Sequence, residues 1–333
     1  MVAARTSNFI HALYKKRLVF AMAEGTRQTL DTPGLIRYRR RMVAPGSPPR
    51  FWSALADLIR LRKQTGSFLL LFPTVWALVL AGEGHPPPFL TAIFVAGVFV
   101  MRSAGVVIND WWDRDLDRLV RRTRERPLAS GLLHPRAAIG VFVALTGIAA
   151  ALVSQLNPLT MALAPIALLL ALLYPLAKRV LPIPQAVLGI AFGWGAVMAW
   201  AAVRNEIGWP ALGVFSATVC WAVGYDTIYA LQDIADDRRI GVRSAAIFFG
   251  EQCWLAVGGS LLTMATIMAL VGAAAGLALP FYLSLAVAAG LFLAQALQIR
   301  RGVSPSQAFA LFAQHVWIGA LILAGIWSGV LWR

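Results

Sequence analysis

Long apolar runs separated by short polar loops constrain this sequence most. Nine runs are long enough to cross a hydrocarbon core, which takes about 20 helical residues. They lie near residues 66–82, 89–108, 137–155, 158–175, 183–203, 209–230, 253–275, 279–298 and 308–331. Because exposed sheet edges cannot exist in lipid and the runs lack the alternation of a membrane barrel, the spans should be helices. The sequence therefore predicts an all-α polytopic membrane bundle of nine transmembrane helices.

The basic residues orient this bundle. Thirteen of the thirty Lys and Arg residues precede the first run, and seven arginines lie between the second and third runs. Lys and Arg accumulate in cytoplasmic loops, so we expect a cytoplasmic N-terminus. The net charge of +15 is then mostly a topology signal, with attraction to anionic membrane lipids and substrates as a second consequence. A nucleic-acid partner is not needed to explain it.

Acidic residues are concentrated in two cytoplasmic loops. Eight of the fifteen fall into two clusters, namely Asp110, Asp113, Asp115 and Asp117, and then Asp226, Asp233, Asp236 and Asp237. If the second span continues past the lipid, Asn109, Asp113 and Asp117 recur at i, i+4 and i+8 and share one helical face. The pattern predicts a row of oxygen ligands at the membrane edge.

The second cluster repeats this spacing. Asp226, Asp233 and Asp237 stand at i, i+7 and i+11, which again gives one face of a continuous helix. Two like-charged faces at the same depth imply a cation between them. Hard oxygen ligands without nearby His or Cys indicate Mg²⁺ or a similar ion.

Mg²⁺ takes part of its coordination shell from water and phosphate oxygens, so we expect a diphosphate as the third party. The cations that would neutralise its remaining charge are Arg118, Arg122, Arg126, Lys178 and Arg179. The alternative is a solvated loop in which opposite charges pair with one another. The presence of two clusters favours the metal site.

Two stretches resemble the UbiA family of intramembrane prenyltransferases: NDWWDRDLD followed by RTRERPLASG, and YDTIYALQDIADD followed by IGVRSAAIFFG. The segments LIRLRKQTGSFLLLFPTVWAL, YPLAKR and PQAVLGIAFGWG are similar to the branch that prenylates 4-hydroxybenzoate. The resemblance begins near residue 57. It implies a prenyltransferase domain over residues 57–333, with a central cavity open to the cytoplasmic side, and leaves residues 1–56 as a basic extension.

The resemblance also implies roles for individual residues. The Mg²⁺ ligands would be Asn109, Asp113, Asp117, Asp233 and Asp237. The catalytic groups would be Asp226, Arg126 and Lys178, of which Arg126 and Lys178 serve as diphosphate partners. Further substrate contacts would come from Arg60, Arg102, Arg122, Arg179, Tyr225 and Tyr229. Ala129 and Arg243 depart from the family pattern, but neither departure removes a ligand.

The implied reaction joins polyprenyl diphosphate to 4-hydroxybenzoate in ubiquinone biosynthesis. Mg²⁺ and basic side chains would stabilise the departing diphosphate, and the phenol ring would attack the prenyl cation ortho to its hydroxyl. A water-poor cavity is required, and Tyr229, Trp194 and Phe192 are candidates for its wall. Other aromatic acceptors, such as homogentisate, a naphthoate or haem, stay open. A secondary transporter would place its acids nearer the midplane.

The acceptor carboxylate needs a cationic partner in such a cavity. Arg102 precedes Asn109 by seven residues, so it should lie on the same face about two turns deeper in the membrane. Arg60 precedes the first span and either joins the site or extends to the headgroups. We expect Arg102 to matter more for the acceptor than Arg60 does.

Other features favour structural roles or leave alternatives. Cys220 and Cys253 are expected to be packing residues, and His315 in the ninth run a buried packing residue. Residues 1–23 resemble either a mitochondrial presequence or a basic cytoplasmic tail. We expect a bacterial inner membrane, with the mitochondrial inner membrane as the alternative. No obligate protein partner is evident.

Overall fold

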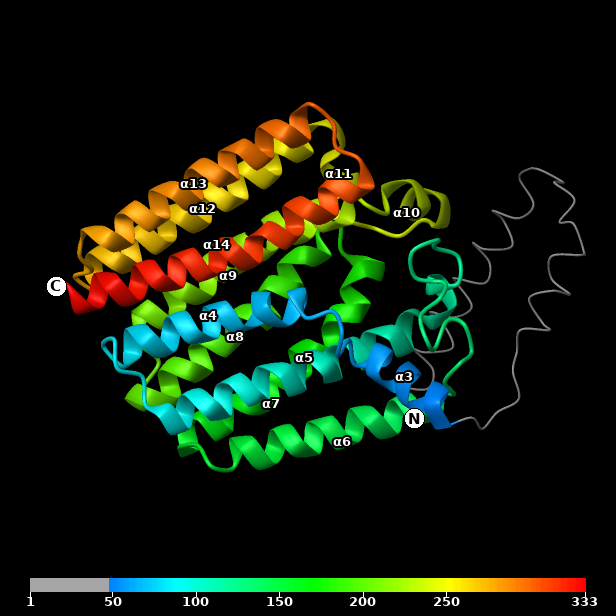
Figure 1. The fold of residues 1–333 in the computed structure, drawn as a ribbon, viewed down its shortest axis with the longest axis horizontal. Coiled ribbons are helices and arrows are strands. Elements are labelled where there is room, and N and C mark those ends of the chain that lie inside the picture. The colour runs from blue at the N-terminus through cyan, green and yellow to red at the C-terminus, as the bar shows by residue number, and fades with distance from the viewer. Residues whose placement is uncertain (1–47) are drawn as a thin grey trace, which may run out of the picture. The chain divides into compact units, whose positions relative to one another are not determined.

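The computed structural model describes residues 48–333, and within this range every regular element is a helix. Figure 1 shows the helices running back and forth beside one another. In chain order they are α3 (Pro48–Leu58), α4 (Thr65–Ala81), α5 (Pro88–Asp117), α6 (Pro135–Val153), α7 (Pro158–Val180), α8 (Pro184–Arg204), α9 (Trp209–Ala230), α10 (Ile234–Ile240), α11 (Ala245–Phe249), the 3₁₀ turn η1 (Gly250–Gln252), α12 (Cys253–Ala274), α13 (Leu279–Arg300) and α14 (Pro305–Leu331).

Eight segments of the described chain are long and apolar enough to cross a membrane: α5, α6, α7, α8, α9, the stretch Ala245–Ala274, α13 and α14. The chain is therefore a multi-pass membrane protein, which confirms the predicted fold class. The remaining predicted span corresponds to α4, an apolar helix of 17 residues that contains Pro73. The number of nine spans stays a prediction because α4 is short for a crossing helix.

Proline starts many of these helices. Pro88, Pro135, Pro158, Pro184 and Pro305 each stand at the first positions of a helix. A proline is suited to this position because its fixed φ is helical and its missing N–H would have had no partner in the first turn. These prolines therefore indicate where the helices begin more sharply than hydropathy does.

Close packing in the centre depends on small residues and buried aromatics. A Cβ at Gly189 would lie 2.7 Å from the Cα of Val219, so α8 and α9 approach closely there. On α9, the Trp221 ring packs with its centroid 5.1 Å from that of Trp76 on α4, and its indole donates a 2.8 Å hydrogen bond to Nδ1 of His315 on α14. The contacts of His315 confirm its interpretation as a buried packing residue. Both cysteines are free.

The amphipathic helix α3 belongs to the helical unit. Ala54 and Leu58 are buried in a small core together with Val107 of α5 and with Leu128 and Leu133 of the following loop. The boundary predicted between residues 56 and 57 thus falls inside α3. Of the basic extension predicted over residues 1–56, residues 1–47 lie outside the described residues.

The two acidic clusters differ in backbone structure. The first stays on α5, which continues as one helix to Asp117, as predicted. The second does not stay on one helix: α9 ends at Ala230, and the amide of Asp233 bonds to the carbonyl of Ala230 in a tight turn. The prediction of one shared face for Asp226, Asp233 and Asp237 was therefore wrong, because α10 is a separate helix.

Candidate active site

A cavity of about 1360 Å³ lies between the helices. Charged and polar side chains line this cavity near the C-terminal ends of α5, α7 and α9. We call this region the acidic end of the bundle. Along α5 its wall runs from Asp110 to Ile93, about 25 Å at the helical rise. The remote part is apolar and includes Phe94, Leu156 and Met198. The cavity thus joins a polar mouth to a long apolar chamber.

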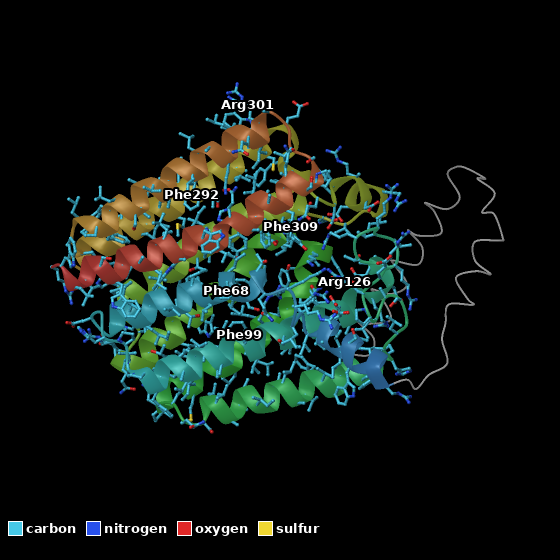
Figure 2. All side chains as sticks on the ribbon, in the orientation of Figure 1. Phe68, Phe99, Arg126, Phe292, Arg301 and Phe309 are labelled. Atoms are coloured by element: carbon cyan, nitrogen blue, oxygen red, sulfur yellow. The ribbon has the colours of Figure 1, made fainter. Side chains whose placement is uncertain are left out.

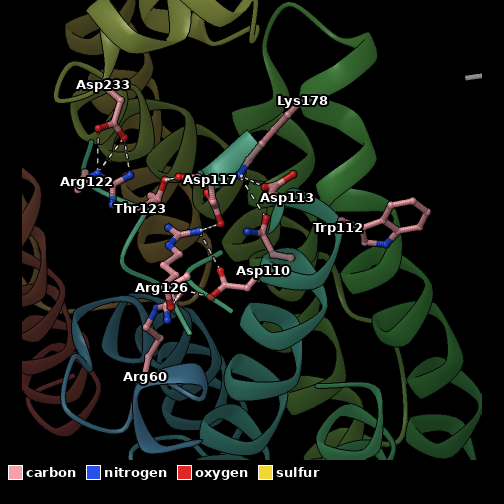
Figure 3. Close-up of polar contacts among 12 residues, drawn as sticks. Arg60, Asp110, Trp112, Asp113, Asp117, Arg122, Thr123, Arg126, Lys178 and Asp233 are labelled. Atoms are coloured by element: carbon pink, nitrogen blue, oxygen red, sulfur yellow. Dashed lines mark hydrogen bonds and ion pairs between the residues drawn. The ribbon is translucent and has the colours of Figure 1, made fainter. Parts of the chain in front are cut away.

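The first acidic cluster is paired with basic side chains (Figure 3). Lys178 of α7 donates to Oδ1 of Asn109 at 3.2 Å and lies 3.6 Å from the carboxylate of Asp113. Arg179 lies 3.7 Å from the other oxygen of Asp113 and donates to the carbonyl of Trp112. Lys178 faces the cavity, whereas Arg179 is not among the residues of its wall. The substrate role of Arg179 stays a prediction.

Arg126 comes from the loop after α5 and lies at the acidic end, as Figure 2 shows. Its Nη1 atom donates 2.9 Å hydrogen bonds to both Asp110 and Asp117. Thr123 fixes the loop by donating to the carbonyl of Asp117. Burial disfavours the charge of Arg126, but the two carboxylates more than offset this effect and raise its pKa. The loop therefore presents a permanently charged guanidinium to the cavity.

Arg122 connects this loop to the second cluster. It forms an ion pair with Asp233 and donates a 2.7 Å hydrogen bond to the hydroxyl of Tyr229, with its guanidinium 5.0 Å from the Tyr229 ring centroid. The carboxylate of Asp237 has no hydrogen bond or ion pair with any described residue. Burial and the neighbouring Asp233 carboxylate raise the pKa of Asp237 to about 6. A bound cation would relieve this unfavourable charge.

Arg102 stands apart from these pairs. Its side chain faces the cavity and makes no hydrogen bond or ion pair with residues 48–333. Gly66 of α4 leaves room for it, because a Cβ at Gly66 would lie 2.6 Å from Nη2 of Arg102. An unpaired guanidinium in a largely apolar cavity is costly unless an anion joins it. Its position is that of an anion-binding group.

Arg60 lies at the mouth of the cavity rather than extending to the headgroups. Its Nη2 atom pairs with Oδ2 of Asp110 at 2.7 Å, and its φ of 58° is unusual for a residue other than glycine. On α9, Tyr225, Asp226 and Tyr229 all line the cavity, and the buried Tyr225 hydroxyl has no partner among the described residues. The YDTIY segment is thus brought to the same cavity as Arg60.

Other predicted residues fall into two groups. Phe192 lines the cavity, but Trp194 does not, because its indole N–H points to the carbonyl of Leu163 at 3.1 Å. The predicted ligands that also lie outside the cavity wall are Asp113, Asp117, Asp233 and Asp237. Three of them pair with basic side chains that do line the cavity: Asp113 with Lys178, Asp117 with Arg126 and Asp233 with Arg122. Sequence reasoning missed Tyr174, whose ring centroid lies 5.1 Å from Nζ of Lys178, although it opens the YPLAKR segment.

The oxygen donors suit a hard cation in type. Within residues 48–333, no three His, Cys, Asp or Glu side chains converge into a group that could hold a metal by themselves. Mg²⁺ needs no such cage, because it binds through one or two carboxylates and completes its shell with water and substrate phosphates. Asn109, the α5 carboxylates and Asp237 therefore fit Mg²⁺ by donor chemistry.

Comparison with known proteins agrees with this chemistry. Residues 70–329 match the model of the UbiA prenyltransferase family. The chain is 45% identical over 270 residues to 4-hydroxybenzoate octaprenyltransferase of Ralstonia nicotianae, which covers 81% of this chain and 92% of that protein.

Two solved structures have the same fold. The apo structure of a UbiA homologue from Aeropyrum pernix K1 is 29% identical, with a TM-score of 0.63 over 77% of this chain and 96% of that one. A UbiA homologue from Archaeoglobus fulgidus bound to GPP and Mg²⁺ is 18% identical, with a TM-score of 0.58 over 84% of this chain and 99% of that one. With the family model spanning most of the sequence, this chain belongs to the UbiA prenyltransferase family.

Proposed function

We propose that this protein transfers a polyprenyl group from polyprenyl diphosphate to the carbon of 4-hydroxybenzoate that lies ortho to its hydroxyl, as a step of ubiquinone biosynthesis. One observation carries the proposal. A single cavity holds oxygen donors and basic side chains at its mouth, an unpaired Arg102 about two turns deeper, and an apolar chamber beyond. The name of the similar Ralstonia protein supports 4-hydroxybenzoate as the acceptor.

The diphosphate belongs at the acidic end. Arg122, Arg126 and Lys178 line the cavity there, and each can donate to phosphate oxygens. The residues that would hold Mg²⁺ are Asn109, Asp113, Asp117, Asp233 and Asp237. When bound, Mg²⁺ supplies Lewis-acid stabilisation to the leaving diphosphate. The basic side chains add fixed positive charge where the diphosphate gains negative charge as the allylic C–O bond breaks.

The acceptor belongs deeper in the cavity. Arg102 pairs with its carboxylate, which would otherwise be an unpaired charge in a largely apolar environment. Asp226 also lines the cavity, and no ion pair with another described residue occupies it. Its carboxylate is placed to accept the proton that the ring loses when aromaticity is restored. Tyr225 and Tyr229 provide aromatic faces that stabilise a nearby cation.

The apolar chamber suits the polyprenyl tail. Its wall extends to Ile93, Met161 and Met198, so the tail leaves water together with the reactive carbon. Exclusion of water prevents capture of the prenyl cation by hydrolysis. We further propose a bacterial inner membrane with the acidic end on the cytoplasmic side, as the distribution of Lys and Arg favours.

One assay tests the function directly. Purified protein is incubated with Mg²⁺, radiolabelled polyprenyl diphosphate and a panel of acceptors that includes 4-hydroxybenzoate, homogentisate and a naphthoate. We expect a labelled, prenylated 4-hydroxybenzoate. Product with another acceptor and none with 4-hydroxybenzoate would overturn the assignment of the acceptor. Uptake of labelled substrate into vesicles without any product would favour transport instead.

A further inference from the structure

Asp110 is the most buried acidic residue of α5. It is 1% exposed, compared with 8% for Asp113 and 7% for Asp117, and unlike those two it lines the cavity. It follows Asn109 directly, so it lies off the face that Asn109, Asp113 and Asp117 share. Nothing in the arrangement of the oxygen donors along that face requires a carboxylate at this position.

Both carboxylate oxygens of Asp110 are occupied by arginines (Figure 3). Oδ1 accepts from Nη1 of Arg126 at 2.9 Å, and Oδ2 accepts from Nη2 of Arg60 at 2.7 Å. The two arginines are 20% exposed in their side chains, so water screens these pairs only in part. Loss of the Asp110 charge leaves Arg60 without an ion pair among the described residues and leaves Arg126 with Asp117 alone, which is unfavourable for partly buried charges.

The two arginines come from separate parts of the chain. Arg60 precedes α4, and its other terminal nitrogen donates to the carbonyl of Asp57 at 2.8 Å. Arg126 comes from the loop after α5 and also contacts Asp117. An arginine loses rotamer entropy when its side chain is fixed, so a partner that already holds it lowers the cost of substrate binding. Asp110 thus holds in place two side chains that face the same cavity from different elements.

We propose that Asp110 is a positioning residue for both substrates and not a metal ligand. It fixes Arg126 for the diphosphate and Arg60 for the aromatic carboxylate, and the three side chains together keep one positive charge for the incoming anions. This inference rests on the proposed function. It predicts that loss of the Asp110 charge weakens the use of both substrates together and leaves the Mg²⁺ requirement unchanged.

Asp110→Asn in the full chain tests this role, because asparagine keeps the volume and one acceptor oxygen but removes the charge. Steady-state kinetics are measured with each substrate varied in turn and with Mg²⁺ varied. We expect the KM for polyprenyl diphosphate and the KM for 4-hydroxybenzoate each to rise about tenfold, because each substrate loses about one hydrogen bond to a charged group. The Mg²⁺ concentration for half-maximal rate should stay within twofold of the wild-type value.

Two comparison variants separate the explanations. Asp115→Asn is the matched control on the same helix, since Asp115 is 60% exposed and, among residues 48–333, pairs only with Arg114 and Arg118. This control variant should change neither the two substrate KM values nor the Mg²⁺ concentration for half-maximal rate by more than about twofold. Asp113→Asn should instead raise the Mg²⁺ requirement. A similar Mg²⁺ shift in Asp110→Asn, a rise in only one substrate constant, or no change at all would overturn the proposal.

A second variant separates a folding defect from a loss of function. If Asp110→Asn is not recovered as a folded protein, Asp110→Glu is measured instead, because glutamate keeps the charge but moves it by one methylene. Unchanged KM values for both substrates in Asp110→Glu would refute the positioning role. Wild-type turnover with 4-hydroxybenzoate in the same experiments tests the proposed function by itself. Titration of wild type and Asp110→Asn with polyprenyl diphosphate and with 4-hydroxybenzoate measures binding without turnover.

Discussion

Gly66→Ala is expected to damage acceptor binding while leaving the fold intact. Gly66 lies in the first turn of α4, and an added Cβ would meet Nη2, Nε and Cζ of Arg102 at 2.6, 2.8 and 3.1 Å. Ordinary van der Waals contact begins near 3.4 Å, so the guanidinium must withdraw by roughly 0.8 Å. Two of these atoms, Nη2 and Nε, are the donors that would form a two-point contact with the 4-hydroxybenzoate carboxylate.

The size of the effect follows from hydrogen-bond geometry. A hydrogen bond to a charged group contributes about 1.5–3 kcal/mol, and it weakens steeply when distance and angle are lost. Loss of one of the two contacts therefore costs about 1.5 kcal/mol, which is about a tenfold rise in KM for 4-hydroxybenzoate. Alanine is the better helix former by up to about 1 kcal/mol, so protein stability should not fall.

Steady-state kinetics with each substrate varied in turn measure this effect. The matched control is Gly259→Ala on α12, where the new Cβ would meet no atom of the described part of the chain within 4 Å. In an Arg102→Ala background, Gly66→Ala should have no further effect on the 4-hydroxybenzoate constant, because the displaced group is already absent. An unchanged 4-hydroxybenzoate KM, or an equal rise in the diphosphate KM, would refute the reasoning.

The remaining predictions concern the proposed ligands, the arginines and the N-terminal residues. Asp113→Ala or Asp233→Ala should abolish transfer while the protein remains inserted and folded; normal turnover at saturating Mg²⁺ would contradict the two-cluster site. Arg102→Ala should weaken 4-hydroxybenzoate use at least about tenfold more than diphosphate binding, and Arg60→Ala less strongly, by the loss of a charged contact. A loss confined to the diphosphate constant would assign Arg102 to the leaving group. Removal of residues 1–47 should leave detergent-solubilised enzyme active, and a folded truncation without substrate binding would show otherwise.

Hydropathy and helical spacing predicted much of the fold because lipid permits few alternatives. A chain that cannot leave backbone groups unpaired in hydrocarbon must form helices over its apolar runs. The spacing of Asn109, Asp113 and Asp117 likewise required a helix beyond the apolar run, and α5 extends to Asp117. The same spacing argument failed after α9. No glycine or proline lies between Ala230 and Ile234, so the sequence carries no ordinary stop signal for the turn that separates α9 from α10.

Ion pairs between residues that are far apart in the sequence explain why the sequence alone leaves the position of Arg60 open. The position of Arg60 before the first apolar run allowed either a site residue or an arginine directed to the headgroups, and hydropathy cannot decide between them. In the structure, Arg60 pairs with Asp110 and lines the cavity. Asp110 is 1% exposed, and a carboxylate buried to that degree requires a compensating cation. Arg60, 50 residues away in sequence, donates to this carboxylate through one terminal nitrogen and to the nearby carbonyl of Asp57 through the other. A buried acid at the end of a membrane helix is therefore a reason to look for inward-facing arginines among residues that composition alone would assign to the membrane surface.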